Sequence, residues 1–142
     1  MVVIPEYSTS PAAMVAADRA SASLGMHIDA LVPGGATVSM LVREDMLNGF
    51  AITHGGIVFT LADTAFALAC NDGGAPVVAA GADIDFLAPT TAGTTLTAVA
   101  VSRAQVGRSG VFDVTITDES GRVVAEFRGR SRRTRTRGAD RS

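Results

Sequence analysis

A short segment, His54-Gly55-Gly56 followed by Asp63, carries the residue types that could perform chemistry. The two glycines begin a run that predicts a helix over residues 55–71. Free N–H groups and the positive end of the helix dipole meet at such a start, and glycine lets a ligand approach the backbone closely. The start of this helix is therefore a candidate oxyanion site. The alternative is a tight turn that requires glycine for steric reasons.

Asp63 places one carboxylate in a helix that is otherwise apolar on every side. The apolar positions are Ile57, Val58, Phe59, Leu61, Ala62, Ala65, Phe66, Ala67, Leu68 and Ala69. A buried carboxylate is costly unless it is paired or hydrogen-bonded, so its presence needs a reason. It could act as a nucleophile or a general base, or it could accept a structural hydrogen bond from Thr60, Thr64 or a loop amide.

The spacing of Gly55 and Asp63 limits any mechanism that uses both. Eight residues correspond to roughly 12 Å along a helix axis, so one carbonyl group cannot touch both. Two such helices that pack antiparallel across a two-fold axis would bring Gly55 of one chain to Asp63 of the other. A helix with no face suited to water also favours coverage by a second copy of the chain. We therefore expect a dimer with shared sites.

The elements around this helix are predicted from helix caps, alternation and turns. Ser10 as N-cap, Pro11 at the first position and Gly25 as C-cap predict a helix over residues 11–24. Strand-like runs are Met26–Val32, Ala36–Val42, Val77–Leu87, Thr94–Val106, Val111–Asp118 and Arg122–Thr134. The first two predict a hairpin and the last four an antiparallel meander. We expect an α+β fold in which the sheet wraps the central helix.

Composition predicts one folded domain over residues 11–134 of the 142, with 47% hydrophobic and 18% charged residues. The single cysteine excludes an intrachain disulfide, and neither a signal peptide nor a membrane span is predicted, so we expect a cytoplasmic protein. All 12 basic residues are arginine and they concentrate near the end, so residues 135–142 are expected to form a basic, flexible tail. Nucleic-acid binding by this tail is disfavoured by the acidic body and the lack of a reading helix.

Three segments resemble a known family. They are "SLGMHI" (23–28), "MLNGFAITHGGIVFTLADTAFALACN" (46–71) and "DIDFLAPTTAGTTLTAVA" (83–100). They resemble the hotdog-fold acyl-CoA thioesterases of the phenylacetic acid degradation (PaaI) type, over roughly residues 12–134. The resemblance implies a sheet wrapped around a central helix, dimers usually paired into tetramers, and hydrolysis of acyl-CoA thioesters without a metal or other cofactor. It favours phenylacetyl-CoA or its ring-hydroxylated forms as substrate.

The resemblance also assigns roles to particular residues. It places the catalytic carboxylate at Asp63, the oxyanion amide at Gly55 and supporting polar groups at His54 and Asn48. His54 would orient the thioester or merely satisfy the turn, and Asn48 would place water or the carbonyl or form an Asx-turn. Thr64 would hydrogen-bond Asp63 or its own backbone. Whether Asp63 is nucleophile or base stays open.

Substrate contacts are less determined by the sequence. Phe59 and Phe86, with Phe66, would line an acyl pocket, or they belong to the core. The chain departs from the family at Ala88, where many relatives carry Arg, and at Ala17, where the family has Asn.

Coenzyme binding has a candidate in the last strand. Arg128, Arg130 and Arg132 share one face there and could bind the CoA phosphates, although a solvated charge row on an edge strand is the commoner explanation. The competing function is a non-catalytic acyl-CoA-binding domain; an acyl-thioester dehydratase is disfavoured, because its characteristic His and carboxylate motif is absent.

Overall fold

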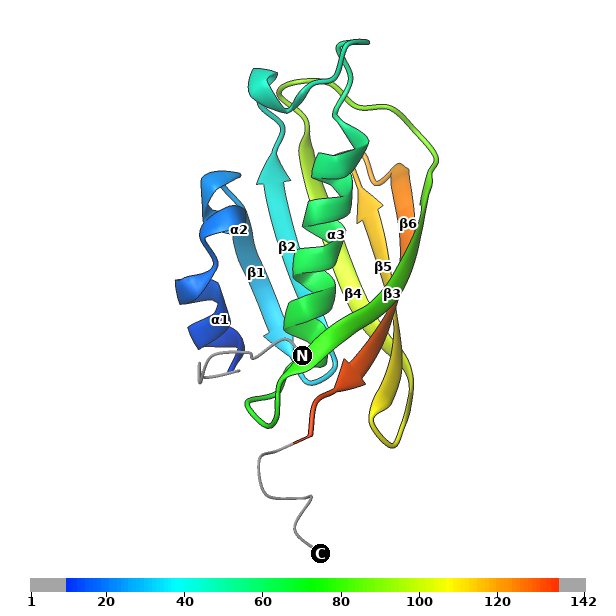
Figure 1. The fold of residues 1–142 in the computed structure, drawn as a ribbon. Coiled ribbons are helices and arrows are strands. Elements are labelled where there is room, and N and C mark those ends of the chain that lie inside the picture. The colour runs from blue at the N-terminus through cyan, green and yellow to red at the C-terminus, as the bar shows by residue number, and fades with distance from the viewer. Residues whose placement is uncertain (1–9, 136–142) are drawn as a thin grey trace, which may run out of the picture.

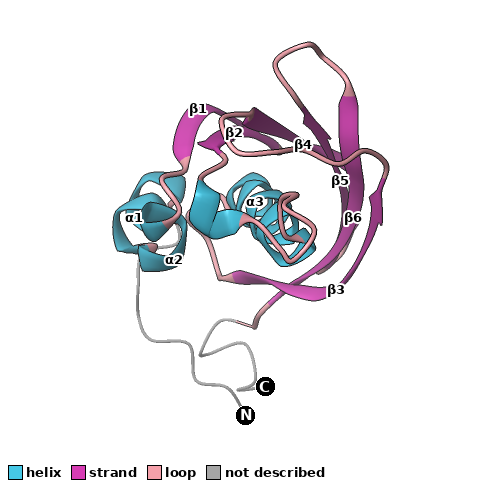
Figure 2. Ribbon diagram, turned by 90° about the horizontal axis from the view of Figure 1, so that it is seen from above, coloured by secondary structure: helices cyan, strands magenta, loops and turns pink. Residues whose placement is uncertain are grey.

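A long helix, α3 (Gly55–Cys70), lies in the concave face of a six-stranded antiparallel sheet (Figure 1). The structure is a computed structural model that describes residues 10–135. Its strands are β1 (His27–Val32), β2 (Gly35–Leu41), β3 (Val77–Phe86), β4 (Thr95–Val106), β5 (Ser109–Thr117) and β6 (Val123–Arg133). Seen from above, the sheet curves around α3 from β1 to β3 (Figure 2). The predicted α+β class and the wrapped central helix are confirmed.

The strand order is β1-β2-β4-β5-β6-β3, so the predicted meander of the last four strands is wrong. β3 pairs antiparallel with β6, from Val77 opposite Arg133 to Phe86 opposite Ala125, and β4 pairs with β2 and β5. The turn residues between β3 and β4 indicate where β3 ends, but they do not indicate which strand β3 pairs with. As a result β1 and β3 are the two edges of the sheet.

The predicted helix over residues 11–24 is in fact two short helices, α1 (Pro11–Ala17) and α2 (Arg19–Ser23). Asp18 separates them with an extended backbone, φ −82° and ψ 94°, and its side chain accepts a hydrogen bond from the Ser21 amide at 2.9 Å. Aspartate competes with the helix for backbone donors and therefore favours a cap over a helix interior. The predicted cap at Ser10 is present, since its hydroxyl accepts from the Ala13 amide.

The core lies between α3 and the concave face of the sheet. Leu61 and Ala65 are fully buried there, and Phe66 meets Phe112 edge to face with ring centroids 5.6 Å apart. Gly129 on β6 must lack a side chain, because a Cβ there would lie 2.7 Å from the Phe66 ring. A helical stripe of Gly56, Thr60, Asp63 and Ala67 is only half-buried or exposed. The described chain thus leaves one side of α3 uncovered.

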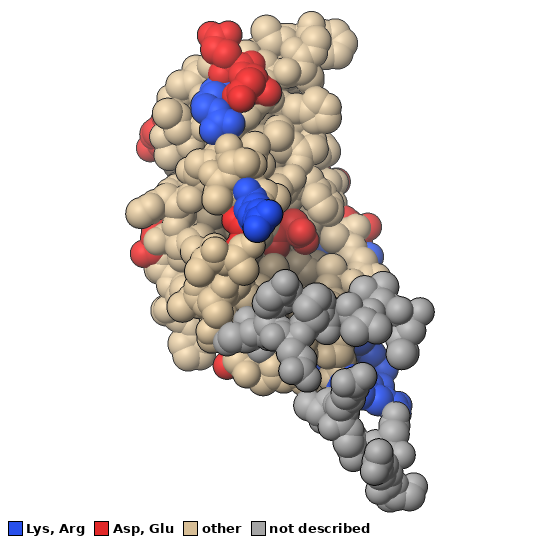
Figure 3. All heavy atoms as spheres, turned by 60° about the vertical axis from the view of Figure 1, so that its left-hand side comes forward, with Lys and Arg blue, Asp and Glu red and all other residues tan. Residues whose placement is uncertain are grey.

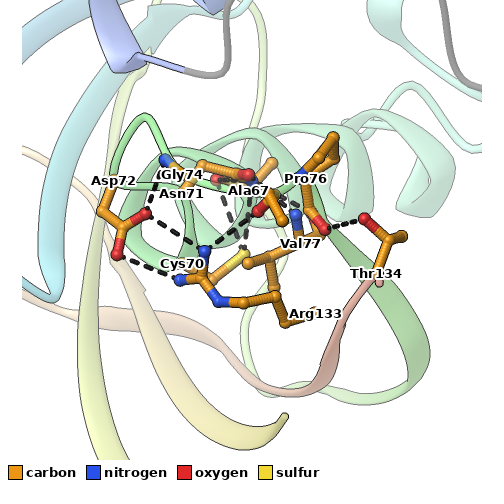
Figure 4. Close-up of polar contacts among 10 residues, drawn as sticks. Ala67, Cys70, Asn71, Asp72, Gly74, Pro76, Val77, Arg133 and Thr134 are labelled. Atoms are coloured by element: carbon orange, nitrogen blue, oxygen red, sulfur yellow. Dashed lines mark hydrogen bonds and ion pairs between the residues drawn. The ribbon is translucent and has the colours of Figure 1, made fainter. Parts of the chain in front are cut away.

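A polar cluster fastens the C-terminal end of α3 to the start of β3 and the end of β6 (Figure 4). The buried Asn71 side chain donates to the carbonyls of Ala67 at 2.9 Å and Val77 at 3.0 Å, and accepts from the Val77 amide at 2.9 Å. Beside it, Arg133 pairs with Asp72 at 3.0 Å. These contacts fix where the edge strand β3 begins relative to the helix.

No helix in residues 10–135 is long and apolar enough to cross a membrane. The part of the expected basic tail that follows Arg135 lies outside the described residues.

Candidate active site

Among residues 10–135, the N-terminal end of α3 has one backbone donor without an acceptor. His54 is the N-cap, and its Nδ1 accepts from the Gly56 amide at 2.9 Å. The His54 amide donates to the Met46 carbonyl at 2.8 Å. Within residues 10–135 the Gly55 N–H makes no hydrogen bond. His54 therefore has the capping role, and Gly55 is the amide left to polarise a carbonyl oxygen.

The Gly55 amide belongs to a pocket of about 470 Å³. Asn48, Val58 and Val124 contribute to its wall, together with Phe86 and the residues that follow it on the way to β4. A Cβ on Gly55 would lie 3.2 Å from Cζ of Phe86, so the aromatic ring closely approaches the start of the helix. The volume is that of a small-molecule site.

Asn48 forms the Asx-turn that was the alternative to a functional role. Its Oδ1 accepts from the Phe50 amide at 2.9 Å and from the Ile52 amide at 3.4 Å. The side-chain nitrogen of Asn48 donates no hydrogen bond within the described residues, and Asn48 is one of the residues that line the pocket at Gly55. The two roles are compatible, because the oxygen holds the loop while the nitrogen stays available to a ligand.

Asp63 is half-buried and receives no hydrogen bond from any residue between 10 and 135. Thr60 donates instead to the Gly56 carbonyl at 2.8 Å, and the Thr64 hydroxyl is 2.8 Å from that of Ser21. Burial raises the pKa of the Asp63 carboxyl above its usual 3.8, and the charge of Asp18 raises it further. A carboxylate with a raised pKa and free oxygens is a stronger base than an ordinary one.

Gly55 and Asp63 are not brought together within one chain. They stand eight residues apart on α3, roughly 12 Å along its axis, and Asp63 does not line the pocket at Gly55. Thr64 lies next to Asp63 on α3. Its hydroxyl was expected to bond Asp63 or its own backbone, but its partner is the Ser21 hydroxyl. The sequence analysis missed Asp18 and Ser21, although the spacing Asp18-x-x-Ser21 is a recognisable N-cap signal.

The predicted aromatic residues separate into two places. Phe59 packs edge to face against Phe127, with ring centroids 5.4 Å apart, and is half-buried beside the core. Phe86 is 55% exposed and lies in the pocket with Gly55. Phe66 belongs to the core. Of the three, Phe86 has the position expected of a substrate contact, and its role remains a prediction.

The three arginines of β6 lie on the convex face of the sheet, away from α3. Arg128 pairs with Asp113 at 2.7 Å, Arg130 pairs with Asp83 at 2.6 Å, and Arg132 donates to the Ser109 hydroxyl at 2.8 Å. β6 lies between β5 and β3, so the explanation of an edge-strand charge row is wrong. The assignment of this row to CoA phosphates remains a prediction. Among the described residues no cluster of His, Cys, Asp or Glu could hold a metal ion.

A six-stranded antiparallel sheet wrapped around one long central helix defines the hotdog class of fold. Residues 50–125 match the family model described as the thioesterase superfamily, and the chain belongs to this family. It is 47% identical over 121 residues to the acyl-coenzyme A thioesterase PaaI of Escherichia coli, covering 85% of this chain and 86% of the relative.

Solved structures agree with this membership. The structure of the E. coli PaaI protein from the phenylacetic acid degradation operon superposes with a TM-score of 0.86 at 45% identity, covering 89% of this chain and 91% of that one. A Streptococcus mutans protein solved with bound acetyl-CoA gives 0.74 at 26% identity, covering 77% and 88%. The predicted family, hotdog fold and thioester hydrolase class are confirmed.

Proposed function

We propose that this protein hydrolyses acyl-CoA thioesters and that its preferred acyl groups are aromatic, phenylacetyl or hydroxyphenylacetyl. The observation that carries the proposal is the pair of groups on α3, the free Gly55 amide and the Asp63 carboxylate that no neighbour within residues 10–135 hydrogen-bonds. The E. coli relative supports the activity, its operon supports the aromatic acyl group, and the acetyl-CoA bound to the S. mutans protein supports a coenzyme A ligand.

The active unit in this proposal is a homodimer, and two dimers assemble into a tetramer. Gly55 and Asp63 of one chain are too far apart to act on one carbonyl, so the site combines Gly55 with the partner's Asp63. Two features of residues 10–135 support a second copy: within this range one side of α3 is uncovered, and β3 is an edge strand of the sheet. Each dimer would then hold two equivalent sites.

In the proposed reaction, the thioester carbonyl oxygen accepts a hydrogen bond from the Gly55 N–H, which stabilises negative charge as the carbonyl carbon is attacked. Asn48 Nδ2 is a second donor at the same pocket, while His54 keeps the Gly56 amide occupied and the helix start in place. The attacking oxygen comes from water that the partner's Asp63 deprotonates, or from that carboxylate itself, in which case a second step, attack of water on the resulting mixed anhydride, releases the free acid and restores Asp63. The carbon–sulfur bond breaks, and CoA leaves as a thiolate that takes up a proton. No metal or other cofactor takes part.

The second candidate is a non-catalytic acyl-CoA-binding domain. It would use the same pocket and the same Gly55 amide, but Asp63 would have no chemical role. The raised pKa of Asp63 favours the enzyme, since a binding site gains nothing from a carboxylate that is costly to keep charged.

Thiol release from phenylacetyl-CoA, hydroxyphenylacetyl-CoA and a short aliphatic acyl-CoA distinguishes these functions. The proteins compared are the wild type, Asp63→Asn and the control Asp72→Asn, which changes an exposed acid just past the same helix. We expect the aromatic substrates to be cleaved fastest and Asp63→Asn to lose about 10³-fold or more, with the control unaffected. CoA-ester binding without release by the wild type would establish the binding domain instead.

An enzyme-only blank is required because the protein has a thiol of its own. Cys70 is buried, and burial raises the pKa of its thiol to about 11, so it stays protonated at neutral pH. We therefore expect the folded protein to add little to the measured thiol signal.

A further inference from the structure

A chain of three polar side chains joins α2 to α3 beside Asp63. Asp18 accepts two hydrogen bonds from Ser21, at 2.6 Å from the hydroxyl and at 2.9 Å from the amide. The Ser21 hydroxyl is also 2.8 Å from that of Thr64. Ser21 has one hydroxyl proton, which it donates to Asp18, so Thr64 donates to Ser21. With Ser21 7% and Thr64 9% exposed, this chain fixes the Asp18 carboxylate against the helix turn that carries Asp63.

The Asp18–Ser21–Thr64 chain lies in largely apolar surroundings. Asp18 and Thr64 both line a cleft of about 270 Å³ between α1 and α3, whose other walls include Met14 and Leu68. Figure 3 shows the face that bears α1 and α2 as mostly tan, with one basic side chain beside acidic ones near its centre. Charges near apolar walls interact more strongly than charges in open water. The charge of the Asp18 carboxylate therefore interacts more strongly with Asp63 than the charge of a fully exposed carboxylate would.

No basic group among the described residues offsets this negative charge at Asp63. Besides burial, the cause that shifts the pKa of Asp63 is the charge of Asp18. Arg19 follows Asp18 on α2 and is exposed, and on β1 the acid Asp29 pairs with His27.

Most of the remaining titratable groups on elements packed against α3 have other partners, and Asp85 on β3 is exposed. Arg133 on β6 pairs with Asp72, and Arg103 and Arg128 hold Asp113 on the convex face. On β3, Asp83 pairs with Arg130. Cys70, on α3 itself, feels the charge of Asp63 but stays a neutral thiol. Asp18 is thus the charged neighbour that matters for Asp63.

We propose that Asp18 is a positioning residue for the hydrolysis: held by Ser21 and Thr64, it places a fixed negative charge beside Asp63 and acts on the reaction through that carboxylate. This inference rests on the proposed function. Asp18 touches neither the substrate nor the attacking water. Its effect is to favour proton uptake by Asp63, which makes Asp63 a better base for water.

The substitution Asp18→Asn removes the charge, keeps the helix cap and reverses the direction of the hydrogen bond to the Ser21 hydroxyl, because Nδ2 donates where Oδ2 accepted. Asparagine is as good an N-cap as aspartate, and its side-chain oxygen can still accept the Ser21 amide, so α2 is retained. The complementary variant Ser21→Ala breaks the link to Thr64 but leaves the Asp18 charge. Asp29→Asn, on the exposed side of β1, is the control for removing an acid from the same part of the surface.

Two readouts are compared in these variants: the titration of the Asp63 carboxyl carbon by 13C NMR, and the pH profile of kcat/KM for phenylacetyl-CoA. In Asp18→Asn we expect the pKa of Asp63 and the acid limb of the profile to move together to lower pH, and kcat at neutral pH to fall by up to about tenfold. Asp29→Asn should move neither readout. Ser21→Ala should reduce kcat less than Asp18→Asn does.

Two results would overturn the inference in distinguishable ways. If Asp18→Asn loses activity while the titration of Asp63 and the acid limb stay in place, Asp18 has only a structural role. If the wild type releases no CoA from any thioester, the proposed function fails, and with it any role of Asp18 in the reaction. In that case the NMR titration still reports separately whether the two carboxylates interact.

Discussion

The Gly55 amide and the Asp63 carboxylate, neither of which has a hydrogen-bond partner within residues 10–135, lie on one helix, eight residues and roughly 12 Å of helix axis apart. The rigid helix fixes this separation, which is too long for one carbonyl to bridge. Two rigid copies of α3 can form two sites. If they pack antiparallel, the Gly55 amide of each chain lies opposite the Asp63 carboxylate of the other.

Replacing Gly55 with proline tests the amide directly. Gly55 is the first residue of α3, a position where proline is favoured, and the preceding His54 already has the extended backbone that proline requires, φ −60° and ψ 131°. Gly55→Pro removes the N–H, and we expect kcat to fall by about 10²–10³-fold. Gly55→Ala is the matched control, because it adds the same Cβ beside Phe86 but keeps the N–H. Equal losses in both variants would mean that crowding, not the amide, matters.

Mixing two inactive variants tests whether the site is shared. In an exchanged mixture of Gly55→Pro and Asp63→Asn chains, half of the dimers are mixed, and each mixed dimer contains one intact site of two. We therefore expect recovery of about a quarter of the wild-type activity at equal total protein. Light scattering on the mixture confirms the assembly state. A mixture that stays as inactive as its components, despite exchange of chains, contradicts the shared site.

The sequence predicted those parts of the fold that depend on local pattern. α3 and the six strands follow from apolar runs and turn residues, and their ends fall within two residues of the expected positions. The strand order did not follow, because pairing of β3 with β6 depends on contacts between residues some fifty positions apart. The break at Asp18 was missed because helix propensity over residues 11–24 is otherwise continuous.

The candidate site divides in the same way. Gly55 and Asp63 were predictable, since a double glycine at a helix start and a lone carboxylate in an apolar helix are both anomalies of sequence. The partners of Thr64 and Asn48 were not, since each depends on a neighbour supplied by the fold. Ser21, 43 positions before Thr64, is the clearest case.

The stability of Asp63→Asn should depend on pH with a defined sign. The pKa of Asp63 is raised in the folded state, so its charged form is disfavoured by folding. Such a group contributes stability below its unfolded pKa of about 3.8 and loses it as pH rises through the higher folded value. At neutral pH Asp63→Asn should therefore melt at an equal or higher temperature than the wild type, and this advantage should shrink in acid. A variant that melts well below the wild type at pH 7 would show that the carboxylate is stabilising.

Arg132 provides the test of the coenzyme prediction. Unlike Arg128 and Arg130, it has a hydroxyl and no carboxylate as partner within residues 10–135, so its charge is the least compensated of the three. If the row binds CoA phosphates, Arg132→Ala should raise KM for an acyl-CoA by about three- to tenfold and leave KM for the matching acyl-pantetheine, which lacks those phosphates, unchanged. If the wild type and the variant have equal KM values for both substrates, the arginines of β6 do not bind the CoA phosphates.

Asn71 is expected to be a stability determinant without a role in chemistry. Asn71→Ala removes three hydrogen bonds to backbone groups and leaves the Val77 amide and carbonyl without their partner, inside the junction between α3 and β3. Such a loss should lower the free energy of unfolding by about 2–4 kcal/mol, measured by urea denaturation. Asp72→Asn, which weakens the exposed pair with Arg133, should cost less than about 1 kcal/mol.

Activity separates this stability effect from a catalytic one. Per assembled dimer, kcat of Asn71→Ala should remain within about twofold of the wild type, because the Gly55 amide and the Asp63 carboxylate both precede the altered junction on α3. Since Asn71 fixes where β3 starts, and β3 is the unpaired edge proposed to meet a second copy, the variant should dissociate at higher protein concentration than the wild type. A large fall in kcat in a fully folded, fully assembled variant would show that the junction positions the site itself.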